Sequence, residues 1–214
     1  MKDNLSKEEI LNEVKKMQLN RKKRFEKNSK NVALKHLIKK ENEEIRIAEE
    51  ATKILDTAKR NEYIYNYVFS VLDEIWKKNN PCKFCNDKCI NHVENGGKLK
   101  RLDGCCYSFE YEHNFFKMDL LKNRQQCKYL GKDKMCKTQN LSCKLYTCDA
   151  IKSRNFEIKI RDFILLKCFF DTKQLLVLKH NFFFSKEEIL DKLMEKNNMP
   201  LILYYYRWKY MIKF

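Results

Sequence analysis

The chain has 214 residues and a net charge of +16, from 45 Lys and Arg against 29 Asp and Glu. This length suffices for one domain with a buried core. The charged start, MKDNLSKEEI, lacks the apolar stretch of a signal peptide, and no run is long and apolar enough to span a membrane. We therefore expect a cytoplasmic protein without a membrane partner.

The positive charge is spread along the chain, with +5 on residues 1–80, +5 on 81–150 and +6 on 151–214. A dedicated nucleic-acid surface usually concentrates its charge locally. The one dense run, Arg21 to Arg24, is interpreted as a solvated helix face. The aromatic segment Tyr204 to Tyr210 is interpreted as packing, with Arg207 and Lys209 reaching solvent. Only weak, non-specific nucleic-acid binding is expected.

Residues 1–80 contain no Gly, Pro or Cys, which predicts a helical N-terminal region. Ser6 and Glu9 have the spacing of a capping box, and Leu5 can pack against Ile10. We expect two or three long helices with breaks near 28–31 and 59–62. Apolar residues at helical spacing predict their packing faces: a weaker stripe of Leu34, Leu37, Ile38, Ile45, Ala48, Ala51, Leu55 and Ala58, and a strong one of Ile64, Tyr67, Val68, Val71, Leu72, Ile75 and Trp76.

The character of the chain changes at Pro81, and residues 81–150 form a second region. All four glycines and nine of the ten cysteines lie in it. Tight ligand loops favour glycine, and a bound ion can supply the folding free energy that irregular loops lack. This pattern predicts a loop-rich segment whose order comes from a metal.

Residues 151–214 are apolar and aromatic, and form the third region. The segment 156–180 suits one or two buried helices, and Ser185 with Glu188 repeats the capping-box spacing. Cys168 lies among core-type residues and is interpreted as a buried thiol without a ligand role. The end, LILYYYRWKYMIKF, fits a strand or a helix. We expect a mainly α-helical protein whose three regions pack as one compact unit.

The clustered cysteines are the candidate metal ligands. Spacing of two residues between Cys82 and Cys85 lets two sulfurs from one turn bind one metal. His92 and His113 lie in the same segment, but lone loop histidines are interpreted as surface residues. Disulfides are not expected in a reducing compartment. The predicted ligand set is Cys82, Cys85, Cys89, Cys105, Cys106, Cys127, Cys136, Cys143 and Cys148.

The order of these cysteines resembles the YkgJ-like cysteine-cluster family, a zinc- or iron-chelating family with a CxxCxxCC cluster. Cys82, Cys85 and Cys89 would stand for its first cysteines, and the adjacent Cys105 and Cys106 for its pair. Cys127 and Cys136 would be its middle pair, and Cys143 or Cys148 its last ligand. Here residues 90–104 split the first cluster, and the family's Arg-Pro pair is absent. The resemblance covers residues 82–148 and implies metal binding without an established reaction.

Four thiolates suit both a structural zinc ion and an iron–sulfur cluster. The lack of two clean CxxC pairs favours iron–sulfur, which would permit redox or modification chemistry. The alternative is a zinc-stabilised, non-enzymatic module that contacts nucleic acid or a protein. No P-loop, GxGxxG, HExxH or nucleophile–base pair occurs in the chain, so the sequence predicts neither a substrate nor a reaction.

Overall fold

The structure is a computed structural model that describes residues 6–82, 129, 131–132, 136–182 and 184–195. In this part of the chain there are nine α-helices, one 3-10 turn and no strand, which confirms the mainly helical prediction. The elements are α1 (Lys7–Lys27), α2 (Val32–Lys39), α3 (Glu41–Lys53), α4 (Thr57–Asn79), α7 (Leu141–Lys144), α8 (Asp149–Lys152), η1 (Ile160–Asp162), α9 (Ile164–Phe169), α10 (Thr172–His180) and α11 (Lys186–Met194).

Both predicted capping boxes are present. The Ser6 backbone N–H donates to Glu9 Oε2 at 2.6 Å, and the Glu9 N–H donates to Ser6 Oγ at 3.2 Å. Ser185 and Glu188 repeat the arrangement at the start of α11. Each box satisfies N–H groups that the first helical turn leaves without partners. The predicted contact of Leu5 lies outside the described residues.

The N-terminal helices break at three places rather than at the two predicted. The break at 28–31 is confirmed, since α1 ends at Lys27 and Asn31 caps α2. The predicted break at 59–62 is wrong. The chain breaks at 54–56 instead, because the Asp56 side chain accepts from the Lys59 N–H at 2.7 Å and caps α4 at its start. A further break at Lys40 separates α2 from α3. The region therefore has four helices instead of two or three.

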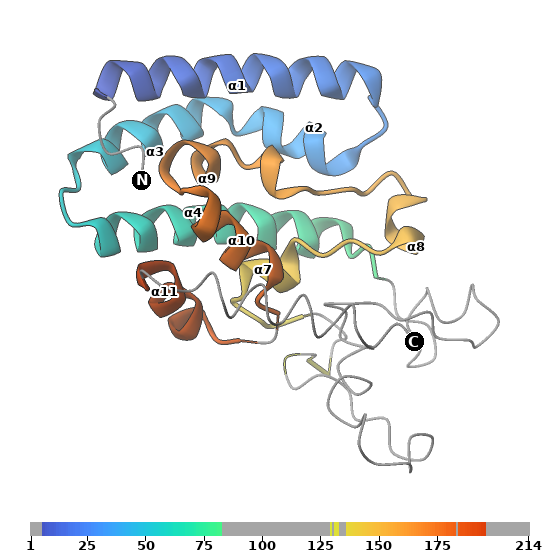
Figure 1. Ribbon diagram of the computed structural model, residues 1–214. Helices are drawn as coiled ribbons and strands as arrows, with labels where there is room; N and C mark the ends of the chain where they lie inside the picture. The colour runs from blue at the N-terminus through green and yellow to red at the C-terminus, as the bar shows by residue number, and fades with distance from the viewer. Residues whose placement is uncertain (1–5, 83–128, 130, 133–135, 183, 196–214) are drawn as a thin grey trace, which may run out of the picture.

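These four helices form an antiparallel stack. In Figure 1, α1 runs along one side, α2 and α3 return beneath it, and α4 runs back below them. Contacts join α1 to α3 and α3 to α4, and α9 packs against α1 and α4. The later helices α7 and α11 pack on α4, and α10 contacts both of them. Within the described residues, no helix has the length and apolar character to cross a membrane.

The strong predicted stripe is the packing face of α4. Six of its seven residues are buried and Tyr67 is half-buried; Tyr65 is also buried on this helix. The residues of the weaker predicted stripe are buried or half-buried as far as Ala51, but the last two are exposed. Leu55 is 92% exposed and Ala58 is exposed, because α3 ends at Lys53 and the chain turns before them.

The interpretation of the Arg21–Arg24 run as a solvated face is wrong for Arg21, and Arg24 is half-buried. Arg21 is 0% exposed, and both of its terminal nitrogens donate to Glu44, at 2.7 and 2.6 Å. Arg24 pairs with buried Asp162 at 2.6 Å. Consecutive helical residues point about 100° apart, so a run of four covers every side of the helix, including the side facing the bundle.

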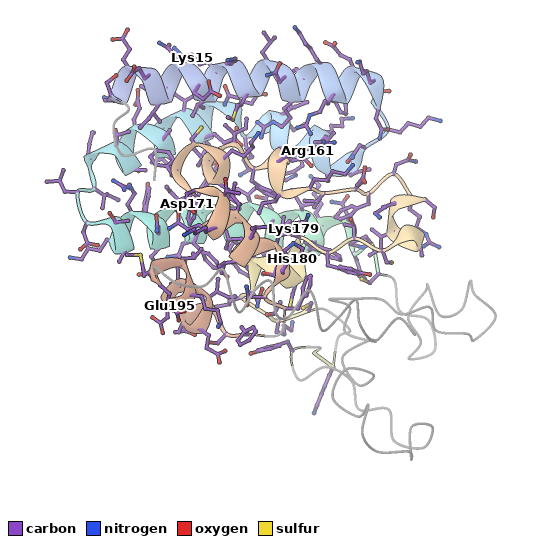
Figure 2. The ribbon with its side chains drawn as sticks, in the orientation of Figure 1. Lys15, Arg161, Asp171, Lys179, His180 and Glu195 are labelled. Carbon is purple, nitrogen blue, oxygen red and sulfur yellow. The ribbon has the colours of Figure 1, made fainter. Side chains whose placement is uncertain are left out.

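The region after 150 contains the predicted buried helices. Within 156–180 the structure has η1, α9 and α10, and Cys168 in α9 is 5% exposed within the hydrophobic core, as predicted. Figure 2 labels Asp171 and His180, the N-cap and the last residue of α10. The segment 196–214, including Tyr204 to Tyr210, lies outside the described residues.

Candidate functional site

The structure places four of the nine predicted ligands: Cys82, Cys136, Cys143 and Cys148. Cys82 follows α4, whose C-cap residue Asn80 has the left-handed conformation (φ 34°) and precedes the buried Pro81. Cys143 lies in α7. Cys148 immediately precedes α8, and its carbonyl accepts from the Ile151 and Lys152 N–H groups. The other five, Cys85, Cys89, Cys105, Cys106 and Cys127, lie outside the described residues, as do His92 and His113.

Within the described residues, no three Cys, His, Asp or Glu side chains gather in a metal-binding arrangement. A complete thiolate site built on Cys136, Cys143 or Cys148 would therefore need donors from the rest of the cysteine segment. What the structure does define is how these three cysteines are attached to the helices.

Lys144 is the central attachment of residues 136–148. Its side chain is buried, at 3% exposed. Its Nζ donates to Asp73 Oδ1 on α4 at 2.8 Å and to the Cys136 carbonyl at 2.9 Å. Burial raises the pKa of Asp73, but hydrogen bonds and charge from Lys144 and Lys77 outweigh it, leaving the pKa below its ordinary value. A charged buried pair of this kind persists only when its hydrogen bonds are satisfied.

Two aromatic side chains of α4 add further attachments. Trp76 Nε1 donates to the Lys144 carbonyl at 2.7 Å. The Tyr65 hydroxyl donates to the Gln139 carbonyl at 2.8 Å and accepts from the Leu141 N–H at 3.1 Å. Burial is the main cause that raises the pKa of Tyr65; the hydrogen bond from the Leu141 N–H opposes this, and negative charge at Cys143 or Glu187 adds to it. The Cys143 turn is therefore seated beside the Tyr65 hydroxyl.

Asn140 and Ser142 attach the same segment to the C-terminal helices. Asn140 caps α7 by accepting from the Cys143 N–H at 3.2 Å, and its Nδ2 donates to the Asn181 and Phe184 carbonyls at 2.8 and 2.9 Å. Ser142 Oγ donates to the Leu178 carbonyl near the end of α10 at 2.8 Å. These bonds join the segment to the end of α10 and to the residues that precede α11.

The segment 136–148 thus has core contacts and hydrogen bonds to the helices, in addition to the metal that the sequence predicts for 82–148. Leu141 is fully buried in the core, and hydrogen bonds join the backbone and side chains around it to α4, to α10 and to the carbonyls of Asn181 and Phe184. Sequence reasoning missed Asp73, Asn140 and Lys144. Trp76 lay on the predicted stripe, but nothing in a lysine-rich chain marks Lys144 as the buried one.

The donor set itself fits a metal, since cysteine thiolates bind zinc and iron–sulfur clusters. The predicted ligands Cys136, Cys143 and Cys148 belong to a segment that hydrogen bonds attach to α4 and α10. No protein-family profile, curated protein or solved structure matches this chain, so relatives supply no function for it.

Proposed function

We propose that this protein binds metal through its cysteine segment, and that it holds an iron–sulfur cluster. The observation that supports the proposal is the placement of Cys136, Cys143 and Cys148. These three predicted ligands lie within 13 residues on a segment bound to α4 and α10 by buried hydrogen bonds. Fixed ligands bind metal more tightly than free ones, because less conformational entropy is lost on binding.

The resemblance to YkgJ-like cysteine-cluster proteins supports the same reading. The full ligand set would draw on Cys82, Cys85, Cys89, Cys105, Cys106 and Cys127 as well as the three late cysteines. The irregular spacing favours an iron–sulfur cluster over zinc. When bound, such a cluster supplies electron transfer or, with one open iron site, Lewis-acid chemistry. The chain's own contribution is to hold the thiolates.

The test is anaerobic purification followed by metal and acid-labile sulfide analysis and a visible spectrum. We expect brown protein containing iron and sulfide. Cys127→Ser and Cys136→Ser should each lose metal, because each removes a thiolate from the ligand set. The matched control is Cys168→Ser, which alters a buried thiol of α9 and should keep full metal content. Equal metal loss in the control, or metal-free wild-type protein, would contradict the proposal.

The alternative function is a zinc-stabilised module that binds a partner. The net charge of +16 favours it, because a basic protein attracts nucleic acid or acidic proteins. Against it, two cations of the densest basic run are paired within the protein, Arg21 with Glu44 and Arg24 with Asp162, so they are less available to a nucleic acid. The same experiment separates the two functions: colourless protein with bound zinc and no sulfide would favour this module.

A further inference from the structure

We infer that Lys144 is a positioning residue that holds Cys136 in the geometry required for metal binding. The inference rests on the proposed function. The Lys144 side chain bridges the Asp73 carboxylate of α4 and the Cys136 carbonyl, so that α4 carries the backbone of a predicted ligand.

Lys144 is anchored at both ends to one face of α4. Its ammonium contacts Asp73, and its carbonyl accepts from Trp76 Nε1 at 2.7 Å. Asp73 and Trp76 are three residues apart on the helix, which places them as neighbours on the same face. The residue therefore has little freedom to move relative to α4, and the bond that it makes to Cys136 transmits this rigidity.

The chemistry of the bridge indicates a role beyond packing. Burying an ammonium is costly, and an apolar side chain of similar length would fill the same volume. The ammonium group has three N–H donors, so it can bind a carboxylate and a peptide carbonyl together, and its charge also neutralises the carboxylate. The carbonyl carbon of Cys136 is bonded to its Cα, so fixing the carbonyl oxygen restrains the backbone from which the thiol projects.

Asp73 gives the experiment a matched pair of lysines. Lys144 and Lys77 both bind this carboxylate, Lys77 at 2.7 Å, but the Lys77 side chain is exposed. Lys144→Met removes the bridge while leaving Asp73 paired with Lys77, so no buried carboxylate is stranded. Lys77→Met removes an ion pair to the same carboxylate and leaves the bridge to Cys136 intact.

The first measurement is titration of the metal-free full chain with Co²⁺, followed through the thiolate-to-cobalt absorption bands. Loss of groups that orient metal ligands typically weakens affinity about 10- to 100-fold, and we expect this for Lys144→Met. Lys77→Met should bind as the wild type does. Asp73→Asn, which weakens the hold on Lys144 with little change of volume, should lie between them.

The second measurement is the alkylation rate of Cys136 in the metal-free protein, relative to that of buried Cys168. Lys144→Met should accelerate Cys136 at least several-fold and leave Cys168 unchanged, which separates local release from general unfolding. Unchanged cobalt affinity and unchanged alkylation in Lys144→Met would overturn the inference.

The two proposals fail in different ways. If Cys136→Ser loses metal while Lys144→Met and Asp73→Asn match the wild type, the positioning role is wrong and the metal site stands. If Cys136→Ser keeps its metal, the proposed ligand is wrong, and with it the positioning of that ligand for metal.

Discussion

Two buried cations, Arg21 and Lys144, occupy different parts of the molecule and have different partners. Both are almost fully excluded from solvent, and both bind a carboxylate on another helix. Arg21 donates to both Glu44 oxygens and to the Asp162 carbonyl, so it joins α1 to α3 and η1. Lys144 divides its bonds between α4 and the backbone of Cys136.

The difference in partners indicates different roles: Arg21 joins helices of the bundle, whereas Lys144 joins the cysteine segment to the bundle. Gln18 also donates to Glu44 and to the Glu41 carbonyl, so the Arg21 cluster connects helices to one another. The Lys144 bridge connects a helix to a segment of predicted ligands. We therefore expect changes at Arg21 to act on stability and changes at Lys144 to act on the cysteine segment.

Replacing Arg21 should have the largest effect on stability. Arg21→Met leaves the Glu44 carboxylate buried without its cation, and breaking a buried pair in this way typically costs about 3–5 kcal/mol in the free energy of unfolding. Urea denaturation measures this. Lys23→Met, in the same basic run but exposed, is the control and should change stability by less than about 0.5 kcal/mol.

The double variant Arg21→Met with Glu44→Leu tests the cause. Removing both charges should recover much of the loss, since well-packed apolar replacements of buried ion pairs are often neutral or stabilising. A double variant as unstable as Arg21→Met would show that the loss comes from packing instead of an unpaired charge.

A smaller effect should appear at His36 of α2, which forms an ion pair with the half-exposed Glu74 of α4 only when its ring is protonated. Burial is the main cause that lowers the pKa of His36, and Lys40 and Lys78 lower it further, against the opposing effect of Glu74. Folding therefore favours the neutral ring. Its contribution to stability is present above the unfolded pKa of about 6.5 and is lost as pH falls through the folded pKa.

His36→Gln should consequently reduce the slope of unfolding free energy against pH between about pH 7.5 and pH 5.5. Thermal denaturation in a series of buffers gives this slope for both proteins. A variant with the same slope as the wild type would assign the pH dependence to other groups.

The smallest expected effect is the response of residues 136–148 to metal removal. Hydrogen bonds to Tyr65, Trp76 and Asn140 do not involve a metal, so backbone amides such as Leu141 and Lys144 should stay protected from hydrogen exchange after chelation. Loss of protection in 136–148 with retention in α1 to α4 would restore the view that metal alone orders this segment.

The fold was largely predictable because helix signals are local. Ser6, Ser185 and Pro81 marked boundaries through chemistry contained within a few residues, and the α4 stripe marked its own buried face. The predicted exposure of Arg21 is wrong because the sequence does not reveal which residue of a charged run faces the bundle. Leu55 was misread because Asp56 starts a new helix immediately after it.

The candidate site was predictable only in its residue types. Thiol clustering predicts Cys136, Cys143 and Cys148 as ligands, which stays a prediction, and their attachment to the helices depends on partners distant in the chain. Lys144 meets Asp73 across 71 residues, and Asn140 meets Phe184 across 44. No periodicity or short spacing encodes such pairs, since they arise only when the helices have packed.

The Asn140 side chain also imposes an order of events during synthesis. It caps the turn that carries Cys143, yet it is fully placed only when it donates to the carbonyls of Asn181 and Phe184. Chains emerge from the ribosome N-terminus first, at about 5–20 residues per second. Helices α1 to α4 can therefore assemble seconds before the Cys143 turn acquires its final support. A nascent chain halted before residue 181 would contain the cysteines without the hydrogen bonds from Asn140 to Asn181 and Phe184.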